Sequence, residues 1–266
     1  MTPRNPYSSV RSVAFDARLA MTKSEIRQKI WQTIQREGVA RFPGAVGRIP
    51  NFVGAEHAAQ ILREMAVWRR ALVVKVNPDA PQHAVRRLAL AEGKILYMAV
   101  PRLRTEKCFV EIDPQRLGKK AALAASLTGA CKYGRAVAPR EMRPVDLVVC
   151  GSVAVGRDGA RLGKGGGYCD LEYGLLREEG KVRESTPILT TVHSLQLVAE
   201  RITMLPHDLP VDFLVTPTEV VATRPAHPRP RGIYWDLLRP LKINAIPLLR
   251  KRLKRGGTGT PSPRRL

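Results

Sequence analysis

Residues 161–170 read Arg161-Leu-Gly-Lys-Gly-Gly-Gly-Tyr-Cys-Asp170, and this stretch decides how the chain is interpreted. Glycine fills four of the five positions 163–167, which frees the backbone to adopt positive φ angles and to approach a ligand closely. Two cations, Arg161 and Lys164, and the carboxylate of Asp170 accompany the glycines. Backbone N–H groups, a guanidinium and an ammonium suit a polyphosphate. The carboxylate suits the Mg²⁺ that accompanies such a ligand.

The segments on either side of this loop predict a strand before it and a helix after it. Residues 147–150, Leu-Val-Val-Cys, are typical of a short buried strand. Residues 156–159, Gly-Arg-Asp-Gly, predict a turn, and residues 171–180 predict a helix. Ligands bind between a strand and a helix start in open α/β sheets. The spacing matches neither a P-loop nor the dinucleotide fingerprint, and an ordinary basic loop stays open as an alternative.

The remaining chain alternates between expected strands and expected helices. We expect further strands at residues 71–76, 94–100, 188–192 and 213–215, and helices at residues 22–37, 55–65, 81–92 and 119–131. This alternation predicts the α/β class, with a layered Rossmann-like domain and a largely parallel sheet flanked by helices. Thr22 and Glu25 form an expected capping box for the first helix. Lys23 and Arg27, four residues apart, share one face of it, which on pattern alone is an ordinary solvated face.

Arg-x-Gly-x-Gly-x-Gly-Tyr-x-Asp resembles the signature of the 5-formyltetrahydrofolate cyclo-ligase family, also called methenyltetrahydrofolate synthetases. Matches to the family's other motifs follow in its order: Lys23-Ser-Glu-Ile-Arg27, Val100-Pro101-Arg102, Asp146-Leu-Val-Val and Val211-Asp212. The resemblance covers residues 22–222. Arg48-Ile-Pro-Asn-Phe-Val-Gly54 and Asp170-Leu-Glu-Tyr173 are similar to the branch typified by methenyltetrahydrofolate synthetase domain-containing proteins.

The resemblance implies an ATP- and Mg²⁺-dependent ligase of one-carbon metabolism. Such an enzyme cyclises 5-formyltetrahydrofolate to 5,10-methenyltetrahydrofolate and releases ADP and phosphate. ATP activates the formyl oxygen by phosphorylation, and N10 of the same folate attacks the activated carbon. The alternatives are an ATP-dependent enzyme for a different substrate and a nucleic-acid-binding or regulatory protein on the same fold. Residues 76–81 and 150–155 differ from the family's pattern, which favours a different substrate. The basic charge favours the nucleic-acid-binding or regulatory protein.

The resemblance also assigns roles to individual residues. The expected ATP-binding residues are Lys23, Arg27, Arg161, Leu162, Gly163, Lys164, Gly165, Gly166, Gly167 and Tyr168. Arg161, Lys164 and Tyr168 are the expected catalytic residues among them. Asp79 and Arg102 are expected to bind the folate, Asp79 being the only carboxylate in residues 76–81. Asp170 and Asp212 are the expected Mg²⁺ ligands.

Composition sets limits on the chain outside this domain. Its 266 residues carry 45 Lys and Arg against 23 Asp and Glu, a net charge of +22 that attracts polyanions. We expect residues 1–20 to be a disordered extension or an overcalled start, residues 21–230 the α/β domain, residues 231–249 a helical arm broken at prolines, and residues 250–266 a basic disordered tail. The tail allows weak, salt-sensitive binding of nucleic acid.

Apolar runs and cysteine spacing predict the setting of the protein. No run of 18 apolar residues exists, so no membrane span is expected. Four cysteines without a Cys-x-x-Cys pair predict reduced thiols in a cytoplasmic protein, and a monomer or homodimer is expected.

Overall fold

The computed structural model describes residues 21–223 and 226–254. The expected N-terminal extension and residues 255–266 of the expected tail lie outside the described residues. Within the described part of the chain, no helix is long and apolar enough to cross a membrane.

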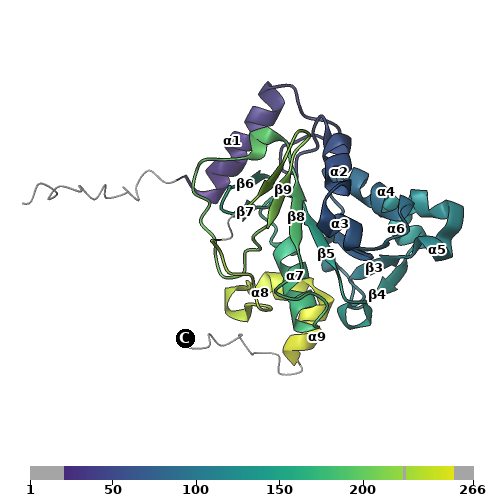
Figure 1. The fold of residues 1–266 in the computed structure, drawn as a ribbon. Helices are drawn as coiled ribbons and strands as arrows, with labels where there is room; N and C mark the ends of the chain where they lie inside the picture. Colours follow the sequence, from purple (N-terminus) through teal and green to yellow (C-terminus); the bar gives the residue numbers. More distant parts are fainter. Residues whose placement is uncertain (1–20, 224–225, 255–266) are drawn as a thin grey trace, which may run out of the picture.

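An eight-stranded mixed sheet occupies the centre of the molecule, with strand order β10-β9-β8-β5-β1-β2-β3-β4 (Figure 1). Its strands are β1 Val73–Val76, β2 Ile95–Ala99, β3 Phe109–Ile112, β4 Arg135–Val137, β5 Leu147–Cys150, β8 Ile188–Thr191, β9 Phe213–Val215 and β10 Val220–Ala222. The five central strands, from β9 to β2, pair in parallel. Antiparallel pairing adds β10 at one edge and β3 and β4 at the other. The predicted α/β class with a largely parallel sheet is confirmed.

Helices cover both faces of this sheet, as parallel strands require. The helices are α1 Lys23–Arg36, α2 Ala55–Arg63, α3 Ala66–Arg70, α4 His83–Ala91, α5 Pro114–Leu117, α6 Leu127–Tyr133, α7 Tyr168–Glu178, α8 Pro240–Ala245 and α9 Pro247–Lys254. Residues of α2, α3, α4 and α6 pack into one buried cluster with alternate residues of β1 and β5, among them Val74 and Val149. Residues of α7 and α9 pack against the other face of the sheet, with Val73 and Val148.

Helix α1 closes a third, smaller core. Ile26, Ile30 and Ile34 are buried against a hairpin formed by β6 Ala154–Val155 and β7 Arg161–Leu162. The capping box is confirmed: Thr22 Oγ1 accepts a hydrogen bond from the Glu25 N–H, and the Glu25 carboxylate accepts one from the Thr22 N–H. The hairpin leads directly into the glycine loop, so α1 is fixed beside that loop.

Several elements differ from the sequence expectation. The helix expected at 119–131 is a 3₁₀ segment, Gly118–Ala125, followed by α6, which Ser126 caps through its side chain. Strands β3, β4 and β10 were not expected; each has only three or four residues and depends on a neighbouring strand for its hydrogen bonds. The C-terminal arm is interrupted at Pro240 and Pro247 as expected. Helix α9, however, continues to Lys254, five residues into the segment expected to be a tail.

Candidate functional site

A cavity of about 660 Å³ opens at the carboxyl ends of the central strands. Its wall includes Asp79 after β1, Arg102 after β2, Gly151 after β5, and the glycine loop with the first turn of α7. This is the edge of a parallel sheet at which ligands bind. The volume lies within the range of pockets for small organic ligands, roughly 300–1,000 Å³.

The glycine loop runs straight into α7. Gly165 has a φ of 99° and Gly167, the N-cap residue, a φ of 63°, a region of backbone conformation that other residues rarely adopt. The helix was expected to begin at residue 171, but it begins at Tyr168. Its unpaired N-terminal N–H groups and the positive end of its dipole therefore lie next to the loop, an arrangement that attracts anions.

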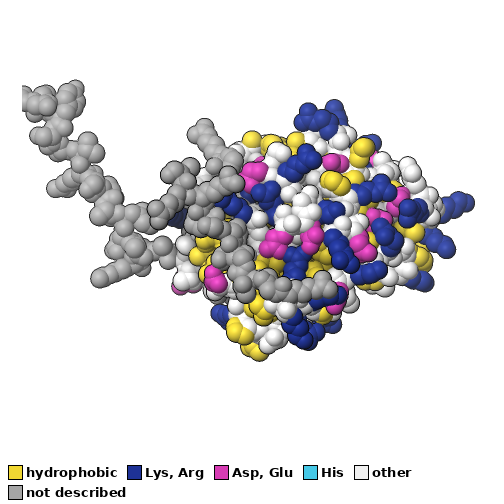
Figure 2. All heavy atoms as spheres, turned by 90° about the horizontal axis from the view of Figure 1, so that it is seen from below, with side chains coloured by type: hydrophobic (Ala, Val, Ile, Leu, Met, Phe, Trp, Pro, Cys, Tyr) yellow, Lys and Arg dark blue, Asp and Glu magenta, His cyan; other side chains and the backbone are white. Residues whose placement is uncertain are grey.

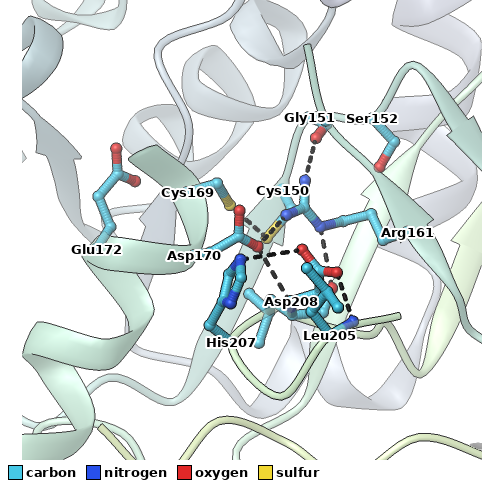
Figure 3. Close-up of polar contacts among 12 residues, drawn as sticks. Cys150, Gly151, Ser152, Arg161, Cys169, Asp170, Glu172, Leu205, His207 and Asp208 are labelled. Atoms are coloured by element: carbon cyan, nitrogen blue, oxygen red, sulfur yellow. Dashed lines mark hydrogen bonds and ion pairs between the residues drawn. The ribbon is translucent and has the colours of Figure 1, made fainter. Parts of the chain in front are cut away.

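Arg161 is buried at the cavity and holds three neighbouring segments together through hydrogen bonds. Its Nε donates to the Leu209 carbonyl at 3.0 Å, Nη1 to the Gly151 carbonyl at 3.1 Å, and Nη2 to Asp170 Oδ1 at 2.5 Å (Figure 3). The same Asp170 oxygen accepts a hydrogen bond from the Leu209 N–H at 3.0 Å. Arg161 thus connects the end of β5 with the first turn of α7, and all three of its nitrogens are occupied. It acts as a positioning residue for Asp170.

Helix α1 brings its two predicted cations to the loop. Arg27 Nε donates to the Gly163 carbonyl at 2.7 Å, and partial burial lowers the pKa of Arg27 against the opposing effect of Asp208. Lys23 forms an ion pair with Asp208, whose Oδ2 also accepts the Leu205 N–H. Both side chains therefore lie on the face of the helix that is turned toward the loop and the segment before β9, and Asp208 is an acidic residue there that the sequence did not indicate.

Lys164 and Asp79 both line the cavity and form an ion pair. Lys164 Nζ donates to Asp79 Oδ1 at 2.9 Å, with the lysine side chain about half exposed. Arg102 follows β2 with a φ of 57°, a strained conformation for a residue other than glycine. Such strain is concentrated at functional sites in proteins. The structure brings these three predicted residues together on one cavity.

The C-terminal arm supplies a further cation. Lys242 of α8 donates a hydrogen bond to the Gly166 carbonyl, and its Nζ lies 3.3 Å from the centre of the Tyr168 ring. Partial burial, only partly offset by Asp170, lowers the pKa of Lys242 to about 8. The glycine loop and this arm both line a second cavity of about 380 Å³. No local pattern pointed to Lys242, because the contact joins residues 76 positions apart.

Asp212 does not lie beside Asp170, so the prediction that the two carboxylates together bind Mg²⁺ is wrong. Asp212 lies immediately before β9, and its carboxylate accepts hydrogen bonds from the Ile188 N–H at the start of β8 and from Arg229, at 2.7 and 2.6 Å. These positions are at the amino ends of the parallel strands, the opposite edge of the sheet from the glycine loop. Asp212 is therefore a structural acceptor. Asp146, likewise, lies before a strand and accepts the N–H groups of Leu72 and Val73, which is a structural role.

The floor of the cavity holds buried polar groups that sequence reasoning missed. Lys75 of β1 donates to Glu172 of α7 and to Asn77. The side chains of Lys75 and Glu172 are almost fully buried. Burial raises the pKa of Glu172 against the opposing effect of Lys75. A lysine within the apolar stretch Leu72-Val-Val-Lys-Val76 was the available signal, because a buried strand tolerates a charge only when it is paired.

Two thiols lie beside this floor. Cys169 Sγ is 3.4 Å from Cys150 Sγ and 3.8 Å from Asn77 Oδ1. The hydrogen bond shared with Cys150, together with the nearby Arg161 and Lys75, lowers the pKa of the Cys169 thiol. The same partnership and burial raise the pKa of Cys150.

Comparison with known proteins gives consistent matches over most of the chain. Residues 20–217 match the 5-formyltetrahydrofolate cyclo-ligase family. The methenyltetrahydrofolate synthase domain-containing protein of Bos taurus is 40% identical over 239 residues, which cover 88% of this chain and 63% of that protein. The protein of the same name in Homo sapiens is 39% identical over 236 residues, covering 87% and 61%. The chain thus spans slightly less than two thirds of the length of these relatives. The solved 5,10-methenyltetrahydrofolate synthetase of Aquifex aeolicus aligns with a TM-score of 0.49 and 22% identity, over 78% of this chain and 95% of that one.

Proposed function

Because the chain belongs to the 5-formyltetrahydrofolate cyclo-ligase family, we propose that it converts 5-formyltetrahydrofolate to 5,10-methenyltetrahydrofolate in an ATP- and Mg²⁺-dependent reaction that releases ADP and phosphate. The observation that carries the proposal is the convergence of the glycine loop, the N-terminus of α7 and several cations on one cavity. Phosphoryl transfer depends mainly on positioning and on neutralising charge, and these groups supply both.

The residues around the loop fit a nucleotide polyphosphate. Gly167 is the N-cap of α7, and the free backbone N–H groups of a helix's first turn are donors that suit an anion. Lys164 extends from the loop itself to Asp79, and Lys242 reaches the loop from the arm. Arg27 is bound to the loop at Gly163 and adds a third positive charge.

A single protein carboxylate also fits Mg²⁺ at this place. Asp170 Oδ1 is taken by Arg161 and Leu209, so Oδ2 is the oxygen we assign to the metal. Mg²⁺ in nucleotide sites is held by one or two carboxylates together with phosphate oxygens and water.

The chemistry needs a leaving group on the formyl oxygen, which ATP supplies when bound. Lys164 and Lys242 would stabilise negative charge on the transferred group, and Tyr168 would hold Lys242 in place through its ring. Arg161 would keep Asp170 oriented throughout. The protein itself supplies no covalent nucleophile in this scheme.

The folate would occupy the side of the cavity next to Asp79 and Arg102. Gly151 makes room there, because a Cβ atom at this position would lie 2.9 Å from Asp79 Oδ2 and 3.0 Å from Gln82 Oε1. Gln82 Oε1 is buried and has no hydrogen-bond partner within the described structure. An N–H donor of a pterin ring would pair with these acceptors, and Arg102 would attract the anionic tail of the folate.

One observation favours an ATP-dependent enzyme for a different substrate. Asp79, the carboxylate assigned to the folate, is paired with Lys164, so it would have to exchange that partner for the substrate. A role in nucleic-acid binding has weaker support. Figure 2 shows Lys and Arg side chains spread over one face, with acidic side chains between them.

The test is formation of the methenyl product, followed by its absorbance, with the full chain, ATP, Mg²⁺ and 5-formyltetrahydrofolate. We expect turnover that requires all three additions. Nucleotide binding without methenyl formation would favour the different substrate, and absence of both would refute the proposal.

A further inference from the structure

Two cysteines from different elements meet at the wall of the large cavity. Cys150 is the last residue of β5 and is fully buried, whereas Cys169 is the second residue of α7 and lines the cavity. Their sulfur atoms are 3.4 Å apart, and Figure 3 shows them facing one another beside Arg161. The other two cysteines lie elsewhere: Cys108 is buried before β3, and Cys131 is exposed on α6.

We propose that Cys150 and Cys169 form a redox pair that closes to a disulfide when a hydroperoxide enters the cavity. Cys169, which faces the cavity, is the thiol that meets the oxidant. Cys150, directly behind it, is the thiol that resolves the oxidised product. The proposal does not depend on which substrate the cavity binds, so it goes beyond the proposed function.

The chemistry balances with a hydroperoxide as the sole oxidant. The sulfur of Cys169 attacks the terminal oxygen of the peroxide, and the O–O bond breaks. A sulfenic acid forms on Cys169, and the thiol proton leaves with the alcohol or, from hydrogen peroxide, with water. The sulfur of Cys150 then attacks the sulfur of Cys169, the S–O bond breaks, and water leaves with the proton of Cys150. Two thiols lose two electrons, and one peroxide gains them.

The geometry requires only a small local movement. Sulfur atoms in a disulfide are about 2.05 Å apart, so the pair has to close by roughly 1.4 Å. Cys169 gives up a contact with Asn77 that is already long, at 3.8 Å. The bond would connect the end of β5 to the first turn of α7, two parts of the same cavity wall.

The position of the pair gives the modification a structural effect. Cys169 stands between Tyr168 and Asp170, and Cys150 precedes Gly151. A covalent bond between these segments fixes the start of α7 to the strand end that Arg161 already braces. Reduction of the bond would restore the present arrangement.

The test oxidises the reduced full-length protein, in its native state, with a small excess of hydrogen peroxide. The remaining thiols are then alkylated under denaturing conditions, and the peptides are mapped by mass spectrometry. We expect two of the four thiols to be lost, recovery of a peptide that links Cys150 to Cys169, and return of both thiols on treatment with dithiothreitol. Formation of the linked peptide should not depend on protein concentration, because the bond is intramolecular.

Two variants serve as matched controls. Cys131→Ser removes an exposed thiol and should leave the linked peptide unchanged, whereas Cys169→Ser should leave Cys150 fully alkylatable after the same treatment. The proposal is overturned if Cys150 and Cys169 in the wild-type protein stay reduced while Cys131 is oxidised. It is equally overturned if Cys169 is recovered as sulfinic acid or bonded to Cys131. The wild-type peptide map decides the matter even if a variant does not fold.

Discussion

Replacement of Lys242 by methionine should weaken nucleotide binding without unfolding the protein. The ammonium group lies 3.3 Å from the centre of the Tyr168 ring and donates to Gly166 of the glycine loop. Methionine keeps a similar length and loses the charge. The loss of one charge-assisted hydrogen bond to a phosphate is worth about 2 kcal/mol, which corresponds to a roughly 30-fold increase in Kd.

The pH dependence follows from the position of Lys242. Burial lowers its pKa to about 8, while Asp170 raises it and Arg102 lowers it further. The charge is therefore present well below pH 8 and is lost as the pH rises through that value. Affinity of the wild-type protein for ATP and Mg²⁺ should fall above about pH 8, and Lys242→Met should lack this inflection.

Isothermal titration calorimetry with ATP and Mg²⁺ measures both effects. Lys254→Met is the matched control, because it removes the same charge from an exposed position at the end of the adjacent helix α9. A Kd for Lys242→Met within twofold of the wild-type value, or an equal loss in Lys254→Met, would refute the assignment of Lys242 to the site.

Three further changes test other parts of the account. Arg161→Met should lower the free energy of unfolding by about 3–5 kcal/mol, because it leaves Asp170 without its buried partner; a urea denaturation curve with a change under about 1 kcal/mol would contradict this. Asp170→Asn should keep the acceptor for Arg161 but abolish Mg²⁺-dependent turnover, and steady-state kinetics that match the wild type would exclude Asp170 as a metal ligand. Thr22→Ala removes the N-cap hydrogen bond of α1 and should lower the free energy of unfolding by about 1 kcal/mol in urea. Thr33→Ala, inside the same helix, is the control, because it leaves that N-cap hydrogen bond in place.

Local patterns in the sequence were sufficient for the main elements of the fold. The capping box of α1, the apolar strand β5 and the glycine loop all depend on neighbouring residues, and each was confirmed. Family membership, expected from residues 161–170 and the motifs around them, was confirmed by the match over residues 20–217.

Long-range contacts decided what the sequence could not provide. The family resemblance assigned Asp212 to Mg²⁺, but Asp212 lies at the amino end of β9, where Arg229 and Ile188 donate hydrogen bonds to its carboxylate. Conversely, Lys242 and Asp208 reach the site only because the arm and the segment before β9 fold back on it. Alternation of strands and helices predicts the layers of a domain, and it does not specify which loop ends meet.

The most direct test of the central claim is a calorimetric titration of the full-length wild-type protein with ATP in the presence and absence of Mg²⁺. The account predicts a single nucleotide per chain, with Mg²⁺ strengthening binding in the wild type and failing to do so in Asp170→Asn. Absence of nucleotide binding to a folded wild-type protein, or binding that Asp170→Asn leaves fully responsive to Mg²⁺, would contradict the assignment of the glycine loop and α7 as the nucleotide site.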